Sequence, residues 1–334
     1  MLIKKSLILI CCALVSGLAY AQTVKQTPKA KPPVSPAKPP INSKSAIKPR
    51  PAPAKAKSKI TSLRKADQTL LWQVSGKGLS QPSFLYGTMH ILCEGDARLS
   101  TGLKKVIKDC GQIFFEVDMD DMQQMIGSLQ LARMADGVKL TDLLTPVEYD
   151  RIKTYFDSHK LMMPLAMMNR FKPYFITAII SEGIMDCEKK KGMEDLIMTE
   201  SKSYEKNIRG LETLEFQASI FDTIPYEKQA KDLLTYIDSI DSFKQTTLEM
   251  VDVYRKQDLN MMDSLIAKSD PGMMQYMDLL LYDRNKRWAM EMPEHMFDKS
   301  TLFAVGAGHL GGEKGVINLL KEQGFTLTPM NNRD

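Results

Sequence analysis

Two of the chain's four histidines follow apolar, strand-like segments at the same spacing. FLYGTMH places Gly87 three residues before His90, and FAVGAGH places Gly306 three residues before His309. Ligands of an open α/β sheet gather outside the carboxyl ends of its parallel strands, and glycine lets the backbone leave a strand sharply because it has no Cβ. If the two strands are neighbours, about 5 Å apart, the two imidazoles can share one metal ion.

Glu116 interrupts the apolar run IFFEV (residues 113–117) within the strand-like segment QIFFEVDM (residues 112–119). Burying a carboxylate is costly unless a cation, a metal or a proton stabilises it. Two histidines and a carboxylate that leave a position for water make a catalytic metal site. We therefore predict that His90, His309 and Glu116 hold a divalent metal ion. This ligand set suits Mn, Co and Zn alike and does not select among them.

Each of these three residues also has a purely structural interpretation. A histidine after a strand is commonly a hydrogen-bonded structural residue, and Glu116 alone fits a strand-end carboxylate paired with Lys or Arg. Their joint occurrence favours the metal site over the structural interpretation.

The second histidine segment also contains a nucleotide-binding pattern. Gly306, Gly308 and Gly311 spell G-x-G-x-x-G. A dinucleotide-binding fold needs this pattern early in a βαβ unit, with an acidic residue about 20 positions later. The next strand-like segment, FTLTPM (325–330), offers no acid. We therefore interpret these glycines as serving the turn around His309.

Sheet-forming units at both ends of the chain enclose a mainly helical segment, from about 120 to 288. This order predicts an α/β fold with a central mixed, largely parallel sheet flanked by helices and a helical insertion. LLWQVSGKG and PSFLYGTMH predict two strands around a glycine turn. Thr145 and Glu148 form a capping box for a helix that runs towards His159. Further predicted elements are helices over 100–109 (ended by Gly111), 244–268 and 313–323, and strands over 206–211, 300–305 and 325–330.

The first 66 residues differ from the rest of the chain. Residues 1–21 have the pattern of a secretory signal peptide, with an apolar stretch and a cleavage site between Ala21 and Gln22. Residues 22–66 are rich in Pro, Lys and Ala, which predicts a disordered linker. The folded domain is predicted over 67–334. We expect a secreted or periplasmic protein with no stable membrane insertion after cleavage.

Charge argues against nucleic acid as a partner. The net charge is +5, but residues 1–66 hold 14 of the 45 basic residues and no acid. The predicted domain therefore has 31 basic and 40 acidic residues, a net charge of −9. A phosphate backbone is bound by basic surfaces. Cleavage of the signal would leave Cys93, Cys110 and Cys187, an odd number that allows at most one internal disulfide and leaves its pairing open.

Several segments together resemble the TraB/GumN family, which includes the Tiki metalloproteases and the TraB/PrgY pheromone-shutdown proteins. They are WQVSGKGLSQPSFLYGTMHIL, FFEVD, GLETLEFQ, DRNKRW and FAVGAGHLGGEKGVINLLKEQGF, in that order, and they extend over about residues 68–330. The resemblance implies an α/β core distantly similar to erythromycin esterase and the haem-binding ChaN proteins.

The resemblance also implies a site built on His90, Glu116 and His309. The family's arginine–asparagine pair corresponds to Arg284 and Asn285. By this resemblance Arg284 would hold a substrate carboxylate or a developing oxyanion. The sequence DRNKR alone indicates an exposed arginine at a charged helix end. Glu212 matches the family's GLE segment. GMED (192–195) resembles a family segment that usually has Asp at its third position, where this chain has Glu194, so that residue is left outside the predicted site.

These observations predict a metal-dependent hydrolase, acting most naturally on peptides. Water activated by the metal and Glu116 would attack a carbonyl, and Arg284 with the backbone from Gly306 to Gly308 would stabilise the oxyanion. A binding protein that sequesters a peptide or a haem-like ligand is one alternative, and a metal-dependent esterase acting on a small carbonyl substrate is another. The oligomeric state stays open.

Overall fold

The computed structural model describes residues 62–120, 130–159, 161, 163–267 and 276–333. The predicted signal peptide and the predicted linker up to residue 61 lie outside the described residues. Ordered contacts begin with Leu63, whose amide donates to Asn260 Oδ1 at 2.9 Å and whose carbonyl accepts from Asn260 Nδ2 at 2.7 Å. The residues just before the predicted domain start at 67 therefore pack on the folded part.

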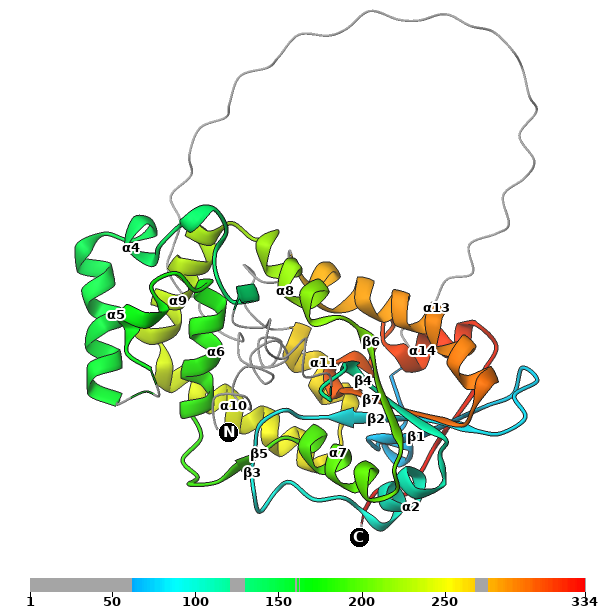
Figure 1. Ribbon diagram of the computed structural model, residues 1–334. Coiled ribbons are helices and arrows are strands. Elements are labelled where there is room, and N and C mark those ends of the chain that lie inside the picture. The colour runs from blue at the N-terminus through cyan, green and yellow to red at the C-terminus, as the bar shows by residue number, and fades with distance from the viewer. Residues whose placement is uncertain (1–61, 121–129, 160, 162, 268–275, 334) are drawn as a thin grey trace, which may run out of the picture. The chain divides into compact units, whose positions relative to one another are not determined.

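A six-stranded mixed sheet in the order β6-β4-β7-β2-β1-β8 forms the centre of the fold (Figure 1). The four strands from β6 to β2 run parallel, and β1 is antiparallel to both β2 and β8. β2, β4 and β7 are almost entirely buried. Parallel strands covered on both faces need such continuous apolar segments. The predicted α/β fold with a largely parallel mixed sheet is confirmed. The strands are β1 (Leu71–Ser75), β2 (Ser83–Thr88), β4 (Gln112–Val117), β6 (Asn207–Glu212), β7 (Thr301–Gly306) and β8 (Thr326–Pro329).

The two strands that lead to the histidines are neighbours in this sheet. β2 and β7 are parallel, with Gly87 opposite Val305 and Thr88 opposite Gly306. The condition set for a shared site, that the strands of the two G-x-x-H segments are neighbours, is therefore met. Gly87 is required by close packing, because a Cβ there would lie 3.0 Å from the Cβ of Ala307.

Helices cover the sheet and form the predicted helical insertion. In Figure 1, α4, α5, α6 and α9 make a group of their own, and α6 is buried along nearly its whole length. The Thr145–Glu148 capping box is present, with backbone amides bonded at 2.9 and 3.3 Å. The longer helices are α2 (Thr101–Asp109), α5 (Pro146–His159), α6 (Pro173–Gly183), α7 (Met193–Ser203), α8 (Leu214–Asp222), α9 (Tyr226–Asp238), α10 (Ile240–Lys256), α11 (Leu259–Ala267), α13 (Asp283–Asp298) and α14 (Val316–Glu322).

Short turns and one small sheet complete the described elements. β3 pairs antiparallel with β5, and a disulfide joins Cys93 in β3 to Cys187, while Cys110 is free and buried. No helix within the described ranges has the length and apolarity to span a bilayer. The short elements are η1 (Lys65–Asp67), β3 (Leu92–Cys93), η2 (Ala135–Gly137), α4 (Leu140–Leu143), η3 (Leu165–Met168), β5 (Lys190–Lys191), η4 (Asp278–Tyr282) and η5 (Ala307–His309).

Two sequence-based details are wrong. The helix predicted over 244–268 is broken into α10 and α11 at Gln257, which has a left-handed φ of 57°. Its side chain accepts from the amide of Leu70 and donates to the carbonyl of Asn332, so tertiary hydrogen bonds fix the break. Gly111 does not end α2 by adopting a left-handed backbone conformation. It is small because a Cβ there would lie 3.2 Å from the Cβ of Lys299.

Candidate functional site

The carboxyl ends of four adjacent parallel strands supply the polar residues of one buried cluster. Glu116 is the penultimate residue of β4, and Glu212 is the last residue of β6. His90 follows β2 by two residues, and His309 ends the short helix η5 that directly follows β7. This is the edge where ligands of parallel α/β sheets bind.

Gly306 lies at the centre of this cluster. A Cβ built on Gly306 would lie 3.1 Å from Glu116 Oε1, 3.5 Å from His309 Cδ2 and 3.7 Å from His90 Nε2. Glu116 Oε1 also accepts a hydrogen bond of 2.8 Å from the Gly306 amide. Three groups from different strands therefore surround one point, and the absence of a side chain at Gly306 keeps that point open.

Each of the two histidine rings is held through its Nδ1 atom. His309 Nδ1 lies 2.6 Å from Asn285 Oδ1, and Asn285 Nδ2 donates to the Lys314 carbonyl at 3.0 Å. His90 Nδ1 lies 2.6 Å from Glu194 Oε1. Both acceptors are buried. In each ring the anchored Nδ1 leaves Nε2 on the side of the cluster, which is the orientation that metal-binding histidines commonly have.

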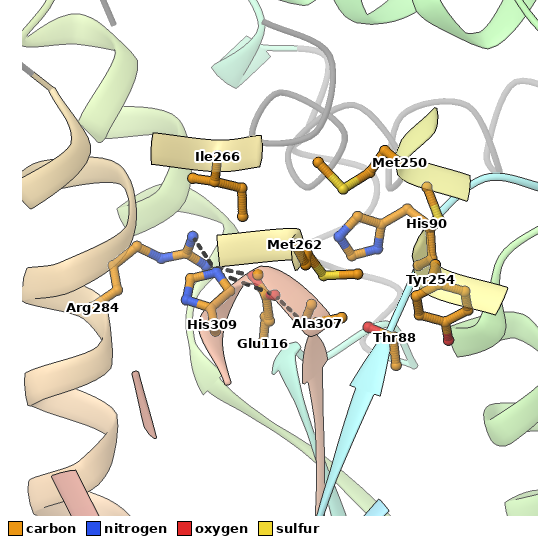
Figure 2. A pocket seen from close by; sticks show the side chains of 13 residues that line it. Thr88, His90, Glu116, Met250, Tyr254, Met262, Ile266, Arg284, Ala307 and His309 are labelled. Atoms are coloured by element: carbon orange, nitrogen blue, oxygen red, sulfur yellow. Dashed lines mark hydrogen bonds and ion pairs between the residues drawn. The ribbon is translucent and has the colours of Figure 1, made fainter. Parts of the chain in front are cut away.

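Arg284 joins the buried carboxylates of Glu116 and Glu212; Figure 2 shows Arg284 beside Glu116 and His309. Its Nη2 atom lies 2.5 Å from Glu116 Oε2 and 2.5 Å from Glu212 Oε1. Its Nη1 atom donates to the Leu280 carbonyl at 3.0 Å and lies 3.4 Å from His309 Nε2. Leu280 belongs to η4, a single π-helical turn before α13, an irregularity frequent at functional sites. Arg284 is 5% exposed, so its interpretation as an exposed arginine is wrong.

Glu212 contacts several of the side chains that surround Glu116. Its side chain is 2% exposed and also contacts Arg287 and the indole of Trp288, the latter at 3.2 Å. Gln217 donates to Glu212 at 2.8 Å and to Glu116 at 3.3 Å. These contacts restrict Glu116 to one orientation, with Oε2 towards Arg284 and Oε1 towards Gly306.

The charges in the cluster are fixed by burial and by Arg284. Burial raises the pKa of Glu116, but Arg284, His309, His90 and the Gly306 amide outweigh it and lower that pKa to about 2. Burial lowers the pKa of His309 to about 3, and Arg284 acts in the same direction although Glu116 opposes it. At neutral pH Glu116 is therefore ionised and His309 is neutral.

The donor chemistry fits a divalent metal ion. Metal ligands must be a neutral imidazole or an ionised carboxylate, and Glu116 and His309 are in those states at neutral pH. Within the described ranges, however, no three His, Cys, Asp or Glu side chains stand close enough together to form a closed coordination group. His309 Nε2 lies 3.6 Å from Glu116 Oε1.

A pocket opens over the cluster. Its floor is formed by the strand ends and the Gly306–His309 turn, and its opposite wall by α10 and α11 (Figure 2). The hydroxyl of Tyr254, from α10, donates to the Gly87 carbonyl at 3.0 Å and so joins this wall to β2.

The structure brings together every residue named from the sequence for the site: His90, Glu116, Glu212, Arg284, Asn285 and His309, with Gly87 and Gly306 at the carboxyl ends of β2 and β7. Their roles in binding and catalysis stay predictions. The Gly306 amide is already bonded to Glu116, so it is not free for the predicted oxyanion contact. Sequence reasoning missed Glu194. The signal was the GMED segment, which we set aside because Glu replaces the usual Asp.

The fold and the cluster define an α/β protein whose parallel strands end in a buried histidine–carboxylate–arginine site. The chain matches the model of the TraB/PrgY/gumN family over residues 70–329, and it belongs to that family.

Curated relatives of the chain are metalloproteases. It is 22% identical over 309 residues to Metalloprotease TIKI1 of Danio rerio, covering 77% of this chain and 62% of that protein. It is 21% identical to Metalloprotease TIKI1 of Homo sapiens, covering 83% and 65%, and 21% identical to Metalloprotease TIKI2 of Danio rerio, covering 77% and 60%. The chain thus spans less than two thirds of the length of these relatives. No solved structure matches it significantly.

Proposed function

We propose that this protein is a metal-dependent peptidase whose site is formed by His90, His309 and Glu116. The observation that carries the proposal is the convergence of their side chains around Gly306. The distant similarity to metalloproteases supports the same reaction class. A bound divalent ion, Mn, Co or Zn by its ligand set, would polarise the substrate carbonyl and acidify a water molecule.

The chain's own residues have distinct tasks in this proposal. Glu116 is ionised at neutral pH, so its Oε1 atom accepts a proton from the attacking water and later returns it to the leaving amine. Arg284 holds Glu116 Oε2, which orients Oε1 towards the pocket. Its Nη1 atom lies on the His309 side, where positive charge stabilises a developing oxyanion. Asn285 fixes the orientation of the His309 ring.

The decisive experiment combines metal analysis with peptide hydrolysis. We expect purified protein to bind about one divalent ion. We expect His90→Ala and His309→Ala to lower the metal content, and to lower the hydrolysis of a mixed fluorogenic peptide library, each by at least about a hundredfold. His159→Ala, at an exposed histidine, is the matched control. Stoichiometric peptide capture without product would instead assign a binding protein, and turnover of esters alone would assign an esterase. Full activity in both site variants would exclude the proposed site.

We also infer that the protein works in a secreted or periplasmic compartment. Disulfides persist in oxidising compartments, and Cys93 and Cys187 are bonded in this fold. This supports the export predicted from residues 1–21. N-terminal sequencing of the mature protein is expected to begin at Gln22, and a full-length reduced protein in the cytoplasm would contradict export.

A further inference from the structure

Thr88 is a buried polar residue that the proposed mechanism does not use. It is the last residue of β2, it is 2% exposed, and it lines the pocket. No described residue offers its Oγ1 atom a hydrogen bond. Figure 2 shows this oxygen turned towards Ala307. Leaving a buried hydroxyl unsatisfied destabilises the fold, so an orphan hydroxyl at a pocket wall indicates a partner that arrives with a ligand.

An apolar wall adjoins the charged cluster in the lining of the pocket. Met89 precedes His90, Met250 lies on α10, and Met262 and Ile266 lie on α11. Each of the four is at most 9% exposed. A Cβ on Gly308 would lie 2.8 Å from Ile266 Cδ1, so α11 packs directly on the turn that leads to His309. Methionine side chains are flexible and polarisable, and they adapt to apolar groups of different shape.

The charged groups of the pocket all belong to the cluster at its floor. Glu116 and Arg284 pair with each other there, and the rest of the described lining carries no Asp, Glu, Lys or Arg. A charged substrate side chain on the methionine side would lose its hydration without gaining a partner. An unbranched apolar side chain would gain burial against the three methionines.

We propose that Thr88 and this apolar wall form a substrate subsite for an apolar amino-acid side chain, with the Thr88 hydroxyl hydrogen-bonded to the adjoining peptide backbone. This subsite rests on the proposed peptidase function, because it places a peptide next to Glu116 and the two histidines. It adds a substrate class: peptides with an unbranched apolar residue, of the size of methionine, at the bond that is cleaved.

The methionines themselves provide the probe for a test that needs no catalysis. Protein labelled with 13C in its methionine methyl groups is titrated with N-acetyl-L-methionine methylamide and, separately, with the corresponding lysine and glutamate amides. We expect the methyl signals of Met89, Met250 and Met262 to shift with the methionine amide alone. Met296, which is buried on α13 and outside the pocket lining, is the control signal and stays unchanged.

Variants at Thr88 test the hydroxyl. Thr88→Val removes it without leaving a cavity and is expected to weaken binding of the methionine amide roughly three- to tenfold, as for one hydrogen bond. The melting temperature should not fall, because the orphan hydroxyl is gone. Thr88→Ser keeps the hydroxyl and should restore binding.

Three results would overturn the subsite: equal shifts with the lysine or glutamate amide, shifts that spare the pocket methionines, or unchanged binding by Thr88→Val. A positive titration with no peptide hydrolysis would leave the subsite standing and reject only the proposed peptidase.

Discussion

Gly306 is the residue on which the geometry of the cluster depends most directly. Its missing side chain keeps open the point between Glu116 Oε1 and the two imidazoles. Gly306→Ala would place a methyl group 3.1 Å from that oxygen. We expect an approximately hundredfold loss of peptidase activity, since misplacement of catalytic groups by about 1 Å has this effect. Circular dichroism should show an unchanged fold.

The matched control for this substitution is Gly95→Ala. Gly95 also has an ordinary backbone conformation, and a Cβ there meets no atom within 4 Å. Its activity should equal that of the wild type. Wild-type activity in Gly306→Ala would show that the three groups do not act at one point.

Glu194 is a positioning residue for His90, as Asn285 is for His309. Glu194→Gln keeps an oxygen acceptor near Nδ1 but removes the charge, whereas Glu194→Leu removes both. We expect metal affinity, measured by chelator competition, to fall modestly in the first variant and 10- to 100-fold in the second, the usual range for residues behind metal-bound histidines. Glu188→Gln, an exposed neighbour along the chain, is the control. Equal affinity in all variants would reduce Glu194 to a packing residue.

At the scale of elements, the small β3–β5 sheet holds the two segments that form the His90–Glu194 contact. The Met193 amide donates to the Met89 carbonyl at 3.0 Å, and a Cβ on Gly192 would lie 2.7 Å from the His90 carbonyl oxygen. The Cys93–Cys187 disulfide crosslinks the same segments. The covalent bond is therefore part of the support of the site as well as of the fold.

Removal of this disulfide should weaken stability and site together. The bond joins residues 94 positions apart, and disulfides typically contribute roughly 2–4 kcal/mol to the free energy of unfolding. Cys93→Ser with Cys187→Ser should lose about that amount in urea denaturation, and metal affinity should fall although His90 and Glu194 are both present. Cys110→Ala, at the free cysteine, should leave metal affinity unchanged. A stable double variant with full metal affinity would contradict the supporting role.

The elements also show which features could be predicted from sequence. The repeated G-x-x-H pattern was sufficient to predict a strand followed by a histidine in each copy, because strand, turn and histidine are contiguous there. It did not determine that β2 and β7 are neighbours, which depends on the order of strands in the sheet. Glu194 could not be found in this way, since its contact with His90 depends on a pairing between segments about a hundred residues apart. The α10–α11 break was hidden because apolar spacing continues through Gln257. The salt bridges of Arg284 were equally invisible, because they depend on how α13 packs against the sheet.

For the whole molecule, the buried His309 predicts an acid-sensitive fold. Its pKa in the folded state is about 3 against 6.5 for an ordinary histidine. As the pH falls below 6.5, the imidazole of His309 becomes protonated in the unfolded chain but stays neutral in the folded protein. The free energy of unfolding therefore decreases from pH 6.5 towards pH 3. Glu116, lowered from 4.5 to about 2, adds to the loss below pH 4.5. Each group contributes at most about 1.4 kcal/mol per pH unit.

Denaturation of metal-free protein between pH 7 and pH 4.5 would measure the histidine part. We expect His309→Gln to flatten the decline between pH 6 and 4.5, whereas His159→Gln, at an exposed position, should follow the wild type. A chelator must be present, because metal and protons compete for the same imidazole. An identical slope in the wild type and in His309→Gln would show that His309 is not held neutral by burial.

The position of β7 in the sheet sets a condition on synthesis. Leu302 pairs with Phe84 on one side and with Ile113 on the other, so a strand near the end of the chain fills the middle of the sheet. Until that strand has been synthesised, β2 and β4 have no partner between them, and their facing edges leave backbone N–H and C=O groups unpaired. The sheet is therefore completed only after residues 301–306 have been synthesised, and a product that stops before Thr301 lacks both the central strand and His309.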